Sequence, residues 1–179
     1  MIFITRHAAG LPPLPHGLVH VAERPGAIIH CTGNKHLAVG LKNLIKRWRI
    51  VHVSHTSPKR FEERDGVMVN VGGFGWKTIG YNFGVGEDED GETVILEGCG
   101  ADVRGAHALG HNRKLGITVF GNGMSLSVAV MDGIEHLVKT YCPGRPVLPH
   151  RRVSKAGKTC PGDVVTAWVE SRWPGGIAA

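Results

Sequence analysis

The chain lacks several features that would place it in a specialised class. It has no apolar run near the roughly 18–20 residues of a membrane-spanning helix, so we expect no membrane insertion. Its first residues lack the charged-then-apolar order of a secretory signal, which predicts synthesis in a cytoplasm. Its four cysteines are widely spaced without a CxxC pattern, which argues against a zinc ribbon or a disulfide framework. With 42% hydrophobic residues among 179, the composition is typical of one compact domain.

The charge balance is basic. Lys and Arg number 21 against 15 Asp and Glu, giving a net charge of +6 and a pI near 9.4. Such a chain favours anionic polymers, either nucleic acid or an acidic cell wall. The basic residues show no interleaved aromatics and no known nucleic-acid motif, so we expect no nucleic-acid partner.

The N-terminal part predicts an arm followed by a domain. Residues 11–17 contain three prolines and read as irregular chain, so residues 1–26 are expected to form an arm packed on a single domain of residues 27–179. The apolar run Ala27 to His30 predicts a buried strand. Apolar residues from Leu37 to Trp48 recur with helical spacing, and Asn34 is a candidate helix cap.

The remaining pattern predicts an α/β fold. Residues 50–53 are compatible with a strand, and we expect residues 50–75 to be an insertion or long loop. Strands are predicted at residues 81–85, 93–96 and 115–120, with a hairpin turn at Asp90-Gly91 between the first two. Helices are predicted over residues 126–138 and from Pro161 through Trp168. This order indicates a central mixed β-sheet flanked by helices.

Three residues far apart in the chain are candidate metal ligands. His30 ends the first buried strand, His150 follows a proline, and Cys160 precedes Pro161. Two imidazoles and one thiolate would leave a fourth tetrahedral position open, as in catalytic zinc sites. Their spacing alone matches no zinc-finger pattern, and an isolated histidine is more often a packed or exposed side chain.

A set of short motifs, in order along residues 27–168, carries a family resemblance. They are Ala27-Ile28-Ile29-His30-Cys31-Thr32-Gly33, Gly80-Tyr81-Asn82-Phe83, Asp90-Gly91, Leu96-Glu97-Gly98, Gly105-Ala106-His107-Ala108-Leu109-Gly110-His111-Asn112, Gly116-Ile117, Gly121-Asn122, His150-Arg151 and Cys160-Pro161-Gly162. In this order they resemble the peptidoglycan recognition protein and type-2 amidase family, including the short phage members.

The resemblance implies an N-acetylmuramoyl-L-alanine amidase, which hydrolyses the amide between N-acetylmuramic acid and L-alanine in peptidoglycan. It implies Zn²⁺ held by His30, His150 and Cys160, and transition-state stabilisation by Tyr81 and Lys158. It also implies a substrate groove lined by four further residues. Trp76 would form a sugar-stacking wall, and Arg104 would replace an arginine that the family has at the position of Cys99 in this chain. The other two are His107 and Asn112.

Several alternatives stay open at this stage. Residues 53–56 also resemble the family's opening-strand motif, so His52 or His55 could replace His30 as the first ligand. The strand at residues 117–119 has no glutamate, and the general base remains unassigned.

For the whole protein, the best match is a monomeric phage endolysin that is made in the bacterial cytoplasm and acts on the cell wall after release. The rival interpretations are a non-catalytic peptidoglycan-binding module and a bacterial amidase that recycles soluble muramyl peptides.

Overall fold

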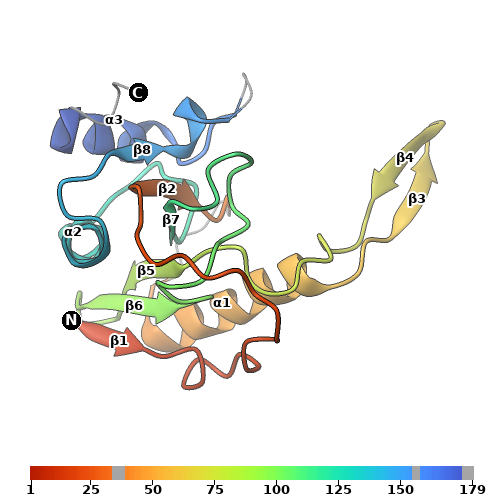
Figure 1. Cartoon of the computed structure of the whole chain (residues 1–179), viewed down its shortest axis with the longest axis horizontal. Coiled ribbons are helices and arrows are strands. Elements are labelled where there is room, and N and C mark those ends of the chain that lie inside the picture. Colours follow the sequence, from red (N-terminus) through yellow and green to blue (C-terminus); the bar gives the residue numbers. More distant parts are fainter. Residues whose placement is uncertain (34–38, 155–157, 175–179) are drawn as a thin grey trace.

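The computed structural model describes residues 1–33, 39–154 and 158–174. A six-stranded sheet forms its centre, with strand order β1-β6-β5-β7-β2-β8 (Figure 1). The β5–β6 pair is antiparallel and the other neighbouring pairs are parallel, which confirms the predicted mixed sheet. The strands are β1 (Ile2–Ile4), β2 (Ala27–Cys31), β5 (Phe83–Glu87), β6 (Thr93–Glu97), β7 (Leu115–Val119) and β8 (Val147–Pro149).

Helices cover both faces of this sheet, also as predicted. Helix α1 (Leu41–Thr56) packs on β5 and β6 from one side, and α2 (Val128–Tyr141) packs on β5, β6 and β7 from the other (Figure 1). Helix α3 (Asp163–Arg172) lies against β8. One apolar cluster lies under α2 and α3, and a second lies under α1. None of the helices in the described part of the chain has the length and apolarity needed to cross a membrane.

Helix α1 is longer than the sequence pattern indicated, and the expected strand at residues 50–53 is wrong. The buried positions of α1 are Leu44, Trp48, His52 and His55. They recur at helical spacing, so the two histidines continue the face that the apolar residues begin. Because histidine is polar, the apolar pattern appeared to stop at Trp48. The expected cap Asn34 and the expected first turn at Leu37 lie outside the described residues.

A two-stranded hairpin occupies most of the segment that was expected to be an insertion or long loop. Strands β3 (Phe61–Arg64) and β4 (Val67–Asn70) pair antiparallel around Asp65-Gly66, and both turn residues have positive φ. Asp-Gly favours this turn because both residues tolerate that conformation. Every residue of the two strands is exposed, and the hairpin projects away from the sheet (Figure 1).

The first 26 residues contain a strand that the sequence analysis did not predict. Strand β1 pairs in parallel with β6 and forms one edge of the sheet. Residues 11–17 contain no helix or strand, as expected from their prolines. The buried Arg6 fastens this part to the domain, since its guanidinium donates to the carbonyl oxygen of Gly98 at 2.7 Å.

Candidate metal centre

His30 is held on an inner strand of the sheet. Strand β2 pairs with β7 on one side and β8 on the other, and His30 lies opposite Thr118. Paired residues of neighbouring strands point to the same face, so both side chains face the side of the sheet that α1 covers in part. The His30 side chain is buried, with 1% of the residue exposed. The pairing of β2 with both neighbouring strands therefore fixes the position of His30.

His150 reaches the same place because β8 ends beside β2. Pro149 pairs with Ile29, and His150 then opens a short 3₁₀ helix, η1 (His150–Arg152). The ring centroids of His30 and His150 are 4.3 Å apart. The Nδ1 atom of His150 is buried and has no hydrogen-bond partner among the described residues. A metal ion is one of the groups that can satisfy such a buried polar atom.

Cys160 enters from the loop before α3. Its carbonyl oxygen accepts from the Arg151 backbone N–H at 2.8 Å, and its Sγ atom accepts from the Cys31 backbone N–H at 3.3 Å. The Sγ atom lies 3.8 Å from Nδ1 of His30. The neighbouring Cys31 thiol and burial raise the pKa of the Cys160 thiol. A bound cation would reverse this effect, because a coordinating thiol is deprotonated by the metal.

These three donors form a set suited to zinc. One donor atom from each of His30, His150 and Cys160 lies within 4.8 Å of the other two. Zinc binds imidazole nitrogen and thiolate sulfur at about 2.0–2.3 Å in tetrahedral geometry, for which roughly 3.5 Å separates two ligands. The observed 3.8 Å between His30 Nδ1 and Cys160 Sγ is close to that value. With the orphaned nitrogen of His150, the geometry fits a three-ligand zinc site with an open fourth position.

The two residues expected to act on the reaction adjoin this cluster. The Tyr81 ring centroid is 5.1 Å from that of His30. Burial, together with the nearby thiols of Cys160 and Cys31, raises the pKa of Tyr81, so its hydroxyl keeps its proton at neutral pH. Lys158 is exposed, and its charge contributes, after burial, to lowering the pKa of His150. Tyr81 therefore lies beside the cluster with a protonated hydroxyl, and Lys158 is close enough for its charge to act on His150.

His107 and Asn112 were expected to line a groove, and both are engaged within the protein. The His107 ring contacts His30, with Nδ1 3.0 Å from Nε2 of His30, and its own Nε2 lies 3.1 Å from the carbonyl oxygen of Lys114. The side-chain oxygen of Asn112 accepts from the Ala108 N–H at 2.8 Å. Asn112 thus stabilises the loop that carries His107. Their contact with substrate stays a prediction.

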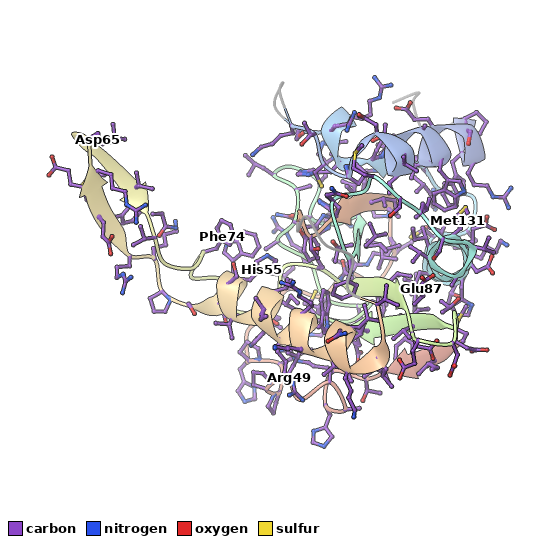
Figure 2. The ribbon with its side chains drawn as sticks, turned by 180° about the vertical axis from the view of Figure 1, so that it is seen from behind. Arg49, His55, Asp65, Phe74, Glu87 and Met131 are labelled. Carbon is purple, nitrogen blue, oxygen red and sulfur yellow. The ribbon has the colours of Figure 1, made fainter. Side chains whose placement is uncertain are left out.

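Trp76 lies at the base of the projecting hairpin in an aromatic group. It stacks on Phe74 at 4.8 Å and contacts His55 at 4.7 Å, and Figure 2 shows His55 and Phe74 together near the end of α1. His55 in turn lies 5.3 Å from Tyr81. This chain of rings links the half-buried Trp76 to the cluster of His30, His150 and Cys160. Arg104 is exposed, its backbone N–H bonds to Val19, and its role in substrate binding stays a prediction.

The two alternative first ligands belong to the buried face of α1. His55 uses Nδ1 to accept the Gly80 N–H at 3.0 Å, so that nitrogen holds the backbone next to Tyr81. Burial lowers the pKa of both histidines. In the described residues the cluster of potential metal ligands contains His30 and neither of these.

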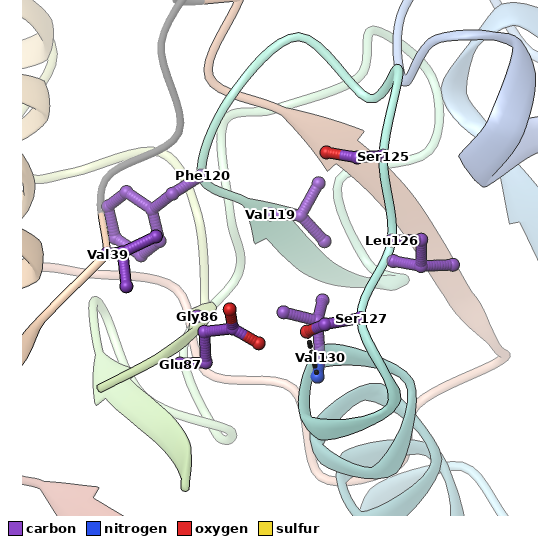
Figure 3. A pocket seen from close by; sticks show the side chains of 9 residues that line it. All are labelled: Val39, Gly86, Glu87, Val119, Phe120, Ser125, Leu126, Ser127 and Val130. Carbon is purple, nitrogen blue, oxygen red and sulfur yellow. Dashed lines mark hydrogen bonds between the residues drawn. The ribbon is translucent and has the colours of Figure 1, made fainter. Parts of the chain in front are cut away.

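A separate pocket of about 220 Å³ contains none of the predicted site residues (Figure 3). Its wall is mainly apolar, with Glu87 as its one charged side chain. The Ser127 hydroxyl, which also lines it, accepts from the Val130 N–H and so caps α2. The pocket has no cluster of reactive groups comparable to that around His30. Its lining residues are Val39, Gly86, Glu87, Val119, Phe120, Ser125, Leu126, Ser127 and Val130.

Comparison with known proteins gives relatives of one kind. No protein-family model matches the chain. Peptidoglycan-recognition protein LB of Drosophila melanogaster is 35% identical over 109 residues, covering 56% of this chain and 44% of that protein. A human N-acetylmuramoyl-L-alanine amidase is 32% identical over 110 residues, covering 56% of this chain and 18% of that protein. The matched segments therefore span less than half of each of these relatives.

Solved structures show the same fold over nearly the whole chain. Wild-type Drosophila PGRP-LB superposes with a TM-score of 0.74 at 28% identity, covering 94% of this chain and 92% of that one. A point mutant of PGRP-LB in complex with tracheal cytotoxin gives the same score and identity, covering 94% and 93%. A chain from the ectodomain complex of PGRP-LCa and PGRP-LCx superposes with a TM-score of 0.76 at 23% identity, covering 97% of this chain and 97% of that one. At this identity the match supports the fold alone.

Proposed function

We propose that the chain is a zinc-dependent N-acetylmuramoyl-L-alanine amidase, on the support of its similarity to peptidoglycan-recognition proteins and to a human amidase. The substrate would be peptidoglycan, and the bond cut would be the amide between N-acetylmuramic acid and L-alanine. The observation that carries the proposal is the convergence of His30, His150 and Cys160, with a buried unpartnered nitrogen on His150.

The chemistry of an amidase matches what these side chains offer. When bound, zinc supplies a Lewis acid that activates water and polarises the scissile carbonyl. His30 and His150 would hold the ion through neutral imidazole nitrogens, and burial lowers the pKa of both rings, which keeps them unprotonated. The thiolate of Cys160 would complete the set. The two histidines and one thiolate leave room for substrate or water at the fourth position.

Tyr81 and Lys158 would stabilise the negative charge that develops on the carbonyl oxygen. A protonated phenol and an ammonium are both hydrogen-bond donors, and a positioned donor of this kind is worth about 10²–10³ in rate. The raised pKa of Tyr81 supports its role as a donor, since the hydroxyl does not ionise near neutral pH. We expect Tyr81→Phe to lower kcat by that factor while the protein still binds zinc.

Substrate recognition would involve the aromatic group at the hairpin base. Trp76 presents a half-buried indole stacked on the exposed Phe74, and such a surface suits the apolar face of a pyranose ring. Arg104 and Asn112 stay the proposed polar contacts. Related PGRP-LB was solved with tracheal cytotoxin, and another related structure describes that compound as monomeric diaminopimelic acid-type peptidoglycan.

The decisive experiment measures amino groups released from purified peptidoglycan by wild type, by chelator-treated protein and by the same protein after zinc is restored. Cys160→Ser should lose both the zinc and the activity. Cys142→Ser is the control variant, because Cys142 is also a free thiol but is buried in the core at the C-terminal end of α2, away from the cluster. The new N-terminus should be L-alanine.

Other outcomes separate the rival functions. Stoichiometric zinc without amide cleavage would indicate a peptidoglycan-binding module. Cleavage of small muramyl peptides but not of intact sacculi would indicate a recycling amidase. The endolysin role, with a monomer made in the cytoplasm and released onto the wall, is part of the proposal and predicts that added protein lyses permeabilised bacteria. A protein that binds no zinc would refute the ligand assignment.

A further inference from the structure

His107 has a place in the site that differs from a groove wall. Its ring meets His30 edge to face, with centroids 5.0 Å apart and planes at 84°. One ring nitrogen faces Nε2 of His30 at 3.0 Å and the other faces the backbone oxygen of Lys114 at 3.1 Å. Both polar atoms of this imidazole are therefore used inside the protein.

The Lys114 carbonyl sets the direction of the whole hydrogen-bond chain. A carbonyl oxygen only accepts, so Nε2 of His107 carries a proton and donates it. In a neutral imidazole the other nitrogen is then an acceptor, so Nδ1 of His107 accepts from Nε2–H of His30. His30 consequently has its proton on Nε2 and its free lone pair on Nδ1. That lone pair faces Sγ of Cys160, 3.8 Å away.

Two glycines hold the His107 ring in this orientation. A Cβ atom on Gly116 would lie 2.3 Å from Cδ2 of His107, and one on Gly105 would lie 2.5 Å from the same atom. Real Cβ contacts are not this short, so the ring occupies space that side chains would fill. Gly116 is itself fixed, because it belongs to β7 and its N–H donates to the buried Asn82 at 2.7 Å.

We propose that His107 is a positioning residue, which fixes the tautomer and the ring orientation of His30 so that Nδ1 is presented to the metal. The expected role in lining the groove does not require these contacts. Residues that orient a ligating histidine in this way contribute about 10–100-fold to metal affinity. The inference rests on the proposed zinc site for its purpose, while the proton order itself is a property of the metal-free protein.

The first test is the tautomer of His30 in metal-free wild type, observed by long-range ¹H–¹⁵N correlation of the histidine ring nitrogens. We expect a protonated Nε2 and an unprotonated Nδ1. His107→Gln should keep this pattern, because an amide oxygen can accept from His30 while the amide nitrogen donates to Lys114. His107→Phe fills similar space without either bond and should give a mixture of tautomers.

The second test is zinc affinity, measured by competition with a chromophoric chelator. We expect His107→Phe to bind zinc about 10–100-fold more weakly and His107→Gln to stay close to wild type. His111→Gln, in the same loop, is the control. Circular dichroism at the assay temperature checks that each variant is folded.

The outcomes distinguish this inference from the proposed function. A protonated Nδ1 on His30 in wild type would overturn the inference without any variant. Unchanged tautomer and zinc affinity in a folded His107→Phe, with weaker muramyl-peptide binding, would overturn it in favour of a substrate contact. The expected tautomers in a wild type that binds no zinc would support the proton order while the proposed amidase function fails.

Discussion

Acid should weaken the fold through His55, and the size of the effect can be worked out from its surroundings. His55 is 8% exposed, and its Nδ1 accepts the Gly80 N–H at 3.0 Å. Burial, with a smaller contribution from His52, lowers the pKa of His55 from 6.5 to about 4. Protonation would place a donor against the Gly80 donor and bury a positive charge. His55 therefore binds a proton less readily in the folded protein than in the unfolded chain.

The sign and the pH window follow from this difference. The folded pKa lies below the unfolded value, so stability is complete above about pH 6.5 and is lost as the pH falls toward 4. At 1.36 kcal/mol per pKa unit, the loss that His55 contributes is on the order of 3 kcal/mol. Other histidines with lowered pKa, among them His30 and His107, act in the same direction. A variant is needed to isolate the share of His55.

The assay is urea unfolding at a series of pH values between 7.5 and 4.5, with chelator present so that metal binding does not contribute. His55→Asn removes the titration while its side-chain oxygen can still accept from Gly80. We expect wild type to lose about 2–3 kcal/mol more than His55→Asn across this range. Equal losses in the two proteins would refute the burial argument for His55.

Three further changes test the packing. Asn82→Ala removes a buried side chain that donates to the carbonyls of Gly100 and Val103 and should destabilise the protein by about 3 kcal/mol or more in urea, whereas a loss under about 1 kcal/mol would contradict its role. Trp48→Phe removes the hydrogen bond from the indole N–H to the carbonyl oxygen of Glu97 and should cost about 1–3 kcal/mol of stability in the same assay. An unchanged stability would mean that water replaces this bond. Arg172 lowers the pKa of Glu135 to about 2, so the ionised Glu135 stabilises the folded protein above roughly pH 4.5 and no longer does so below pH 2. Glu135→Gln should therefore lower the Tm at pH 7 by an amount that corresponds to under about 1 kcal/mol, and this difference should vanish near pH 2.

The sequence predicts elements well where one type of residue dominates them. The strands that became β2, β5, β6 and β7 are nearly continuous apolar runs, as strands buried on both faces of a sheet require. Helix α1 was cut short because its buried face changes from apolar residues to His52 and His55. Contacts with Gly80 and the aromatic group hold His55 in this buried face, and no local pattern reveals them.

The sequence analysis did not assign two other elements, the β3–β4 hairpin and strand β1. The Asp65-Gly66 turn is the same type of signal that correctly placed the turn at Asp90-Gly91, and it predicts the projecting hairpin when applied there. Strand β1 is three residues long and its assignment depends on pairing with β6, which lies about 90 residues away in the sequence. A short edge strand of this kind cannot be recognised from its own residues.

The candidate ligands were identifiable from motifs, while their supporting contacts were not. His30, His150 and Cys160 each lie in a short recognisable segment, and the parallel pairing of β2 with β8 brings two of them together. The hydrogen bond from His30 to His107 depends on the loop that carries both His107 and Lys114, and on the absence of side chains at two glycines. Sequence order therefore indicated that His107 was in the site without indicating what it does there.

The hairpin of β3 and β4 should be less stable than the rest of the domain. A two-stranded hairpin with no buried face is marginal in water, whereas the six-stranded sheet is enclosed by helices on both faces. The hairpin can therefore open by local fluctuation while the rest of the domain remains folded, and its amide protons should exchange much faster than those of β2 and β7. A protease should cut first between Phe61 and Asn70. The two fragments should stay associated, because β1 and β2 precede the cut and are paired with strands that follow it.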